Sequence, residues 1–324
     1  MKLTLGTYTK RISQGIYTIE LNEDNKMLEN LVLLTEIQHP TYLDIQGNRL
    51  YTVVKDKASG LRMYEDMKFI NQITQEETPP CYVSSISESG MVFSANYHEG
   101  HIDLYSTQED KLNHLQRITY PEGSHAHCIA YAQSFNEVYV CDLGLNKVLT
   151  YTLINQRLIL KHTFNTLPKQ GPRHFVIHPI LPILYVFAEL SSEVLVLRRY
   201  DDHFQQIQVI DTLPIGENLF RSGAAIRISK DGKFLYVSNR GHDSLTVFKV
   251  QTDASLEMIQ NIPTYGKHPR DFNLSPDDRF LVVANLMSDN LSLFERDQES
   301  GLLKLLQDNV FAPEVTCVVF SETS

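Results

Sequence analysis

The chain has 324 residues, of which 42% are hydrophobic and 21% are charged, a composition that is typical of a globular protein and excludes general disorder. Its formal net charge at pH 7 is −10. Because an acidic surface repels phosphate backbones, we expect no nucleic acid among its partners.

The first predicted elements are two short strands near the N-terminus, at residues 3–7 and 16–21. The second strand begins with Ile16-Tyr17-Thr18-Ile19, and similar strands that follow a turn recur along the whole chain. The seven copies begin at residues 16, 61, 102, 148, 194, 245 and 291, on average about 46 residues apart. This spacing is close to the length of one four-stranded blade of a β-propeller.

Three further short strands accompany each internal copy. A second apolar strand precedes the copy, as at residues 235–237, and a turn rich in Gly, Asn or Asp precedes that strand. A third strand comes before the turn, for example at residues 225–228, and a weaker fourth strand follows the copy. No helical periodicity is sustained, so the pattern predicts an all-β fold of four-stranded antiparallel blades. The alternative is an open all-β sandwich, which seven in-phase repeats disfavour.

The two chain ends complete the set of blades. The N-terminal strands lack a first strand, and the C-terminal strand predicted at residues 315–320 has no hairpin partner of its own. We therefore predict that residues 1–35 and 314–320 together form the seventh blade, which closes the ring and removes its open edges. The prediction is a single domain, residues 1–324, folded as a seven-bladed β-propeller.

Ionisable residues collect at one predicted face of the ring. The first and second strands of a blade are antiparallel, so the start of the first and the end of the second lie on the same face. The ionisable residues at these positions include His127, Arg173, Glu189, Arg221, Arg240 and Arg270. Propellers usually carry function at such a channel mouth, and the concentration of arginine on an acidic chain predicts a small anionic ligand.

Three motifs resemble those of one known family. They are GPRHFVIHP at residues 171–179, Ser124-His125-Ala126-His127, and AAIRISKDGKFLYVSNR at residues 224–240. These motifs look like the lactonase family of seven-bladed β-propellers, which includes a bacterial type of 6-phosphogluconolactonase and the fungal carboxy-cis,cis-muconate cyclising enzyme. The similarity covers essentially the whole chain.

The resemblance implies a set of site residues and an activity. By motif, the catalytic residues of the family fall on His127, Arg173, Glu189 and Arg240. Residues at neighbouring positions become candidates for substrate binding, namely Arg221, Arg270, His125 and Asn239. The implied activity is lactone hydrolysis, most specifically of 6-phosphoglucono-lactone, a reaction of the pentose phosphate pathway.

Opening a lactone needs an activated water and a group that stabilises the oxyanion. Either Glu189 or His127 could take the proton of the water, and the sequence does not decide between them. Arg173 and Arg240 could hold the carbonyl oxygen and the anionic part of the substrate through charge-assisted hydrogen bonds. No metal-ligand spacing or nucleotide-binding motif is visible, so we expect no metal and no cofactor.

Two other functions stay open at this point. The chain could be a lactonase or a cycloisomerase that acts on another sugar or carboxylated lactone. It could also be a non-catalytic propeller that binds a partner on its rim, because a fold alone does not determine a function.

The cysteines and the apolar pattern bear on location. Cys81, Cys128, Cys141 and Cys317 show no metal-ligand spacing, and we expect free thiols in a reducing cytoplasm. The chain has no run of 18 apolar residues, and residues 1–6 do not resemble a secretion signal. We therefore expect a cytoplasmic monomer or homodimer that does not bind membranes.

Overall fold

A computed structural model describes residues 1–86, 88–214, 216 and 220–321. Its elements are strands, apart from one short 3-10 turn, η1 (Gln108–Asp110). No helix in this part of the chain is long and apolar enough to cross a membrane. The chain divides into two compact units: unit 1 comprises Met1–Thr35 with Arg173–Ser324, and unit 2 comprises Glu36–Pro172.

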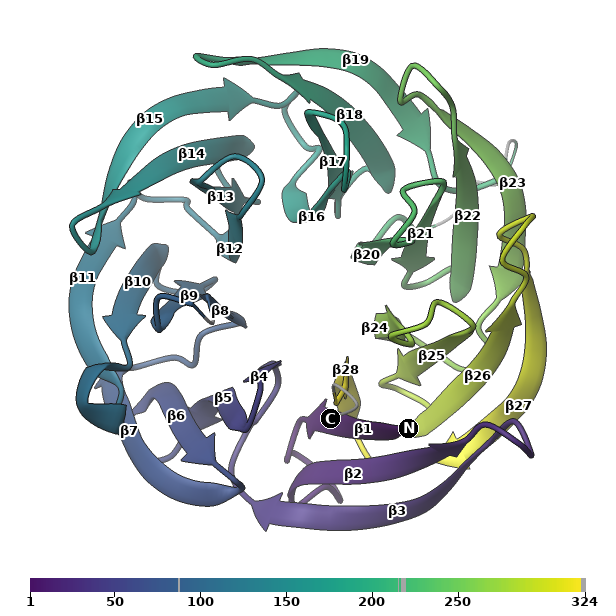
Figure 1. Cartoon of the computed structure of the whole chain (residues 1–324), viewed down its shortest axis with the longest axis horizontal. Coiled ribbons are helices and arrows are strands. Elements are labelled where there is room, and N and C mark those ends of the chain that lie inside the picture. The colour runs from purple at the N-terminus through teal and green to yellow at the C-terminus, as the bar shows by residue number, and fades with distance from the viewer. Residues whose placement is uncertain (87, 215, 217–219, 322–324) are drawn as a thin grey trace. The chain divides into compact units, whose positions relative to one another are not determined.

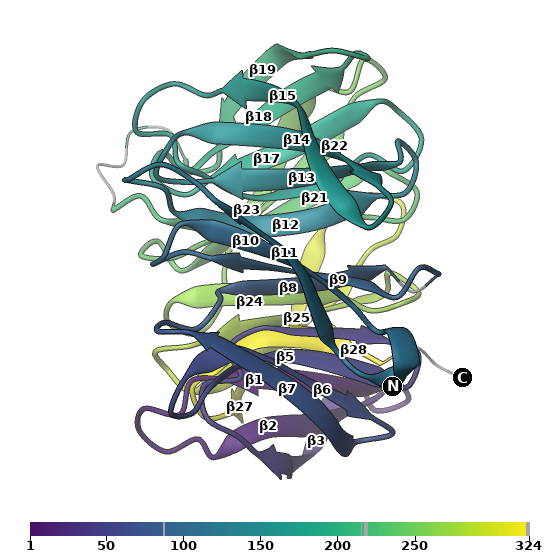
Figure 2. The same ribbon diagram turned by 90° about the vertical axis from the view of Figure 1, so that its left-hand side faces the viewer.

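Unit 2 contains three four-stranded antiparallel sheets, each made of consecutive strands. The first has β4 (Leu43–Gln46), β5 (Arg49–Lys55), β6 (Ser59–Glu65) and β7 (Lys68–Glu76). The second has β8 (Tyr82–Ile86), β9 (Met91–Asn96), β10 (His101–Ser106) and β11 (Asn113–Thr119). The third has β12 (Ala126–Ala132), β13 (Glu137–Asp142), β14 (Lys147–Ile154) and β15 (Arg157–Asn165), whose neighbouring strands can be followed in Figures 1 and 2.

Unit 1 contains four such sheets. Three follow the chain order, and the first of these has β16 (Pro172–Ile177), β17 (Ile183–Ala188), β18 (Glu193–Arg199) and β19 (Phe204–Asp211). The second has β20 (Gly223–Ile228), β21 (Phe234–Asn239), β22 (Ser244–Val250) and β23 (Leu256–Pro263). The third has β24 (Pro269–Leu274), β25 (Phe280–Asn285), β26 (Asn290–Arg296) and β27 (Leu303–Phe311). The fourth sheet joins the chain ends in the order β28 (Val315–Phe320), β1 (Lys2–Thr7), β2 (Gly15–Asn22) and β3 (Met27–Glu36).

The pairing of the chain ends confirms the predicted role of the C-terminal strand. β28 runs antiparallel to β1, with Leu3 opposite Phe320 and Leu5 opposite Val318. β28 spans the same residues, 315–320, that the sequence pattern predicts. The N-terminal hairpin therefore obtains its missing first strand from the far end of the chain.

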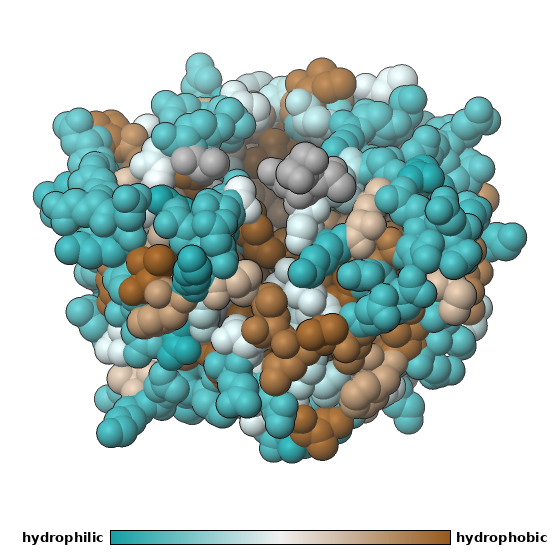
Figure 3. Space-filling model, turned by 60° about the horizontal axis from the view of Figure 1, so that its bottom comes forward, coloured by the Kyte–Doolittle hydropathy of each residue, from teal (hydrophilic) through white to brown (hydrophobic). Residues whose placement is uncertain are grey.

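The second strand of most blades lies in the core of its unit. β17, β21 and β25 are buried at every position, which explains why their sequences are apolar without alternation. The outer strands β19, β23 and β27 instead mix buried and exposed residues. The outer surface is largely hydrophilic in the view of Figure 3, with hydrophobic side chains between the polar ones.

Polar side chains at the end of the second strand fix the loops beside them. In unit 1, Asn285 donates from Nδ2 to the carbonyl oxygen of Thr264, in the loop before β24, at 3.4 Å. In unit 2, Asp142 accepts hydrogen bonds from Ser124 Oγ at 2.5 Å and from the amide of His125 at 3.0 Å. These buried bonds hold the loops that carry the candidate site residues.

Candidate active site

The fourth blade in chain order brings together the first two candidate residues. Arg173 is the second residue of β16, and Glu189 directly follows β17. Because the two strands are neighbours in one antiparallel sheet, the start of β16 and the end of β17 lie at the same edge. Arg173 Nε lies 3.0 Å from Glu189 Oε2, so the side chains form an ion pair.

The next blade of unit 1 supplies a second guanidinium. Arg240 directly follows β21, at the position that corresponds to Glu189 in the preceding blade. Arg240 Nη2 lies 2.8 Å from Glu189 Oε2, the same oxygen that Arg173 contacts. One carboxylate oxygen therefore joins arginines from two consecutive blades.

The first two residues of β20 hold both arginines in place. Arg240 Nη2 donates to the carbonyl oxygen of Gly223 at 2.7 Å, and Arg173 Nη1 donates to that of Ala224 at 2.6 Å. A Cβ atom at Gly223 would lie 2.6 Å from Cζ of Phe187, so a larger residue could not fit without a shift. The glycine lets β20 approach β17 closely enough for its carbonyl groups to reach the two guanidinium groups.

Burial and charge distinguish the three side chains. Arg173 is 2% exposed and Arg240 is 6% exposed, whereas the side chain of Glu189 keeps 19% of its surface accessible. Burial, together with the positive charge of Arg173, lowers the pKa of Arg240 to about 10. Both ion pairs use Glu189 Oε2, and the partly accessible side chain of Glu189 can meet a water or a ligand.

His268 extends this cluster, although the sequence analysis did not select it as a site residue. It immediately precedes β24, and its amide donates to Asp243 Oδ1 at 2.7 Å. Burial, followed by the positive charges of Arg240, Arg270 and Arg173, lowers the pKa of His268 to about 4. The imidazole is therefore neutral at pH 7, and this effect depends on spatial neighbours that no local motif identifies.

Two of the predicted substrate-binding residues have other partners. Arg221 contacts both carboxylate oxygens of Asp211, at 3.0 and 2.6 Å, and donates to the carbonyl oxygen of Ser191 at 2.6 Å. Asn239 is 1% exposed and accepts a hydrogen bond from Thr212 Oγ1 at 2.8 Å. The structure does not bring either residue to Glu189, and both stabilise local loop structure.

His125 and His127 belong to unit 2, where they lie beside one tyrosine. The His125 ring stacks on Tyr97 with a centroid separation of 4.3 Å, and its Nδ1 lies 2.8 Å from the carbonyl oxygen of Tyr97. His127, on β12, is 4% exposed and meets the same ring edge-on at 5.8 Å. The Tyr97 ring thus holds both imidazoles in defined orientations.

A buried charge cluster that no sequence motif revealed joins the first and second sheets of unit 2. Potential ligand atoms of Glu76, His101 and Asp103 lie within 4.8 Å of one another, a geometry that could hold a metal ion. However, Arg117 donates to both oxygens of Asp103, at 2.9 and 2.8 Å, and already supplies a positive charge there. Burial lowers the pKa of His101, but the hydrogen bonds that its ring donates to Asp103 and Glu76 outweigh this effect and raise the pKa to about 9. We interpret the cluster as an internal ion network.

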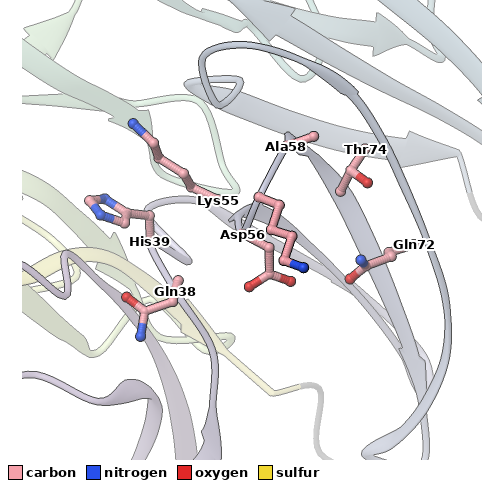
Figure 4. A pocket seen from close by; sticks show the side chains of 8 residues that line it. Gln38, His39, Lys55, Asp56, Ala58, Gln72 and Thr74 are labelled. Carbon is pink, nitrogen blue, oxygen red and sulfur yellow. The ribbon is translucent and has the colours of Figure 1, made fainter.

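Unit 2 also has an open pocket of about 750 Å³, shown in Figure 4. It is lined by Gln38, His39, Lys55, Asp56, Lys57, Ala58, Gln72 and Thr74. Lys55 extends to the side of the pocket that holds His39, away from Gln72 and Thr74 (Figure 4). Asp56 pairs with Arg62 at 2.8 Å, so the pocket combines two lysines with one carboxylate that is already neutralised.

Comparison with protein families gives one match over almost the whole chain. The family described as "Lactonase, 7-bladed beta-propeller" matches residues 2–320. Its seven blades agree with the seven four-stranded sheets, so the predicted fold class is confirmed.

Individual relatives are similar over their full length. The 6-phosphogluconolactonase of Bacillus subtilis is 36% identical over 98% of this chain and 97% of its own. A crystal structure of a protein from Lactobacillus plantarum has a TM-score of 0.96 at 36% identity, covering 99% of both chains. The periplasmic gluconolactonase of Pseudomonas aeruginosa has a TM-score of 0.91 at 26% identity, covering 98% of both chains.

Proposed function

Because the chain belongs to the lactonase family of seven-bladed β-propellers, we propose that it hydrolyses 6-phosphoglucono-lactone to 6-phosphogluconate. The similarity to the Bacillus enzyme over nearly all of both chains supports lactone hydrolysis as the reaction. The observation that carries the proposal for the site is the carboxylate of Glu189, which contacts two buried guanidinium groups through one oxygen while its side chain stays partly accessible.

In the proposed reaction, Glu189 acts as the general base. A water held by its Oε1 attacks the carbonyl carbon of the lactone, and the proton of the water passes to the carboxylate. When the bond between that carbon and the ring oxygen breaks, the ring oxygen takes the proton from Glu189 and becomes a hydroxyl group. The new carboxylic acid then releases its own proton to water.

The two arginines take different parts in this proposal. Arg240 stabilises the oxyanion that forms on the carbonyl oxygen, because its Nη1 makes no hydrogen bond to the described residues and remains able to donate. Arg173 is more deeply buried, and its bonds to Glu189 and Ala224 make it a positioning residue. It holds the carboxylate of Glu189 in a fixed orientation.

His127 stays a second candidate for the base. Its assignment rests on the family motif and on its fixed orientation against Tyr97 in unit 2. Imidazole is an effective base near neutral pH, so we keep His127 in the comparison of variants below.

An unphosphorylated sugar lactone is a second candidate substrate. The gluconolactonase of Pseudomonas aeruginosa has nearly the same fold, and its name gives no phosphate on the substrate. The site around Glu189 recognises the lactone group, which both substrates share.

The decisive experiment adds purified protein to 6-phosphoglucono-δ-lactone and to glucono-δ-lactone and measures acid release above spontaneous hydrolysis. We expect acceleration with the phosphorylated lactone and its loss in Glu189→Gln. His127→Ala is compared with Glu189→Gln to separate the two candidates for the base. Only the variant that lacks the true base should lose the pH dependence of kcat that arises from ionisation of that base. Failure to accelerate either lactone would refute the proposed function.

We also propose a cytoplasmic location and a role in the pentose phosphate pathway. Cys81, Cys128, Cys141 and Cys317 are all free thiols, as expected for a protein of a reducing compartment. Fractionation of cells tests the location directly, since the similar Pseudomonas enzyme is periplasmic.

A further inference from the structure

The charge around Glu189 is not balanced within unit 1. Arg173 and Arg240 share a single carboxylate, and Arg270 lies close enough to lower the pKa of Arg240 after the larger effects of burial and Arg173. His268 adds no charge at pH 7. Two guanidinium groups therefore contact one carboxylate, and Arg270 adds a further positive charge nearby.

Arg270 has no ionic partner among the residues that the structure describes. Its guanidinium carbon lies 5.8 Å from the ring centroid of Tyr8, in the loop after β1. Lys10 Nζ lies 4.6 Å from the centroid of the same ring and likewise has no carboxylate partner in the described chain. Two cations thus meet one aromatic ring, and neither has a carboxylate partner among the residues that the structure describes.

A buried carboxylate holds the loop of Lys10 in a fixed shape. Glu314, 2% exposed, accepts hydrogen bonds from the backbone amides of residues 10, 11, 12 and 13 at 2.8–3.0 Å. Burial opposes ionisation of Glu314, but these bonds hold its pKa below the ordinary value. Because the backbone is fixed in this way, the loop presents the Lys10 side chain with little additional loss of conformational entropy on binding.

The neighbouring Arg11 shows that this loop can neutralise its cations where no ligand is needed. Its guanidinium donates to both oxygens of Asp289, at 2.9 and 2.8 Å, and also lies near Glu314. Lys10, one residue earlier, points to the Tyr8 ring and lacks such a partner. The difference separates a structural cation from one that is available to a ligand.

We propose that Tyr8, Lys10 and Arg270 form a subsite for the phosphate group of the substrate, next to the cluster that holds the lactone group. This inference rests on the proposed function, and it identifies the substrate class as a phosphorylated sugar lactone. Arg270 and Lys10 bind the phosphate oxygens through charge-assisted hydrogen bonds, and Tyr8 separates and orients the two cations. Arg270 lies near Arg240, which contacts Glu189, and Lys10 shares the Tyr8 ring with Arg270, so the proposed phosphate subsite adjoins the cluster around Glu189.

The test measures binding of 6-phosphogluconate and of gluconate by calorimetry, which does not depend on turnover. We expect the wild-type protein to bind the phosphorylated acid more tightly. Arg270→Ala and Lys10→Ala should each weaken binding of 6-phosphogluconate on the order of tenfold to a hundredfold while changing gluconate binding little. Arg11→Ala is the matched control from the same loop, and it should keep the wild-type preference.

A second readout compares kcat/KM for phosphorylated and unphosphorylated lactone. The subsite predicts that Arg270→Ala and Lys10→Ala reduce the ratio of the two values by a similar factor. Equal binding of the two acids by the wild-type protein, or a preference that survives in both variants, would overturn the subsite even if the protein is a lactonase. Conversely, absence of lactone hydrolysis would refute the proposed function, while the calorimetric result would still decide the phosphate subsite.

Discussion

Replacement of Glu189 by Gln removes one negative charge and keeps the size of the side chain. In the wild-type protein, Oε2 of Glu189 lies 3.0 Å from Arg173 and 2.8 Å from Arg240. At an effective dielectric constant of 20, each contact is worth roughly 6 kcal/mol before desolvation. Most of this gain is offset by the cost of removing the groups from water, and loss of one partner of such a buried pair typically destabilises a protein by about 3–5 kcal/mol.

We expect the lower end of that range, about 3 kcal/mol, because the Glu189 side chain is 19% exposed and water can partly replace it. For a chain of 324 residues, this corresponds to a decrease in Tm of roughly 4 °C. If Glu189 is the general base, as proposed, it should also contribute about 10²- to 10⁴-fold to kcat. Circular dichroism during heating measures the first effect, and acid release from 6-phosphoglucono-δ-lactone measures the second.

A matched control is Glu257→Gln, which removes an exposed carboxylate of β23 in the same unit. Glu257 accepts one hydrogen bond, from Gln251 at 2.8 Å, so its loss should change neither Tm nor kcat measurably. An unchanged kcat in Glu189→Gln would refute the role of Glu189 as base. An unchanged Tm would refute the claim that Glu189 compensates the two buried guanidinium groups.

Three further predictions concern other parts of the chain. Between pH 6.5 and pH 4, His268 binds a proton in the unfolded chain but not in the folded chain. The free energy of unfolding should therefore decrease by up to about 3 kcal/mol as the pH is lowered through this range. Urea titrations of His268→Gln should show a smaller decrease. Arg117→Met leaves the carboxylate of Asp103 buried without its guanidinium partner and should lower the free energy of unfolding by about 3 kcal/mol, a loss that a wild-type urea midpoint would contradict. In Gly223→Ala, the new methyl group would collide with Phe187, so residue 223 and its carbonyl group, which holds Arg240, must shift. We expect kcat to fall about tenfold or more. Full activity would show that β20 does not position Arg240.

The strands could be predicted because the same pattern of apolar strands and turns recurs at a regular spacing. A buried second strand such as β21 needs apolar residues at every position, and the same need recurs about every 46 residues along the chain. The C-terminal strand followed from a count of what the N-terminal hairpin lacked, and its pairing with β1 is observed. Local chemistry and periodicity are sufficient for this level of the structure.

The site could be predicted only as far as strand ends determine it. Antiparallel pairing placed Arg173 near Glu189, and the equivalent position in the next blade placed Arg240 there. The same reasoning selected Arg221, which instead pairs with Asp211. A position on a loop limits where a long side chain can reach, but the nearest available carboxylate determines where it binds, and that carboxylate can come from any neighbouring strand.

Charge balance explains why the sequence alone does not show which cations lack a carboxylate partner. The whole chain has a net charge of −10, and most of its arginines have carboxylate partners, as Arg11 does with Asp289. Such pairing cannot be read from the sequence, since Arg11 and Asp289 are nearly the whole chain apart. Arg270 is a candidate from its sequence position, but only the three-dimensional structure shows that Arg270 and Lys10 lack carboxylate partners among the described residues and meet the same ring. An acidic protein can therefore hold a selective phosphate site, because two cations without partners attract an anion more strongly at short range than a distant, solvent-screened net charge repels it.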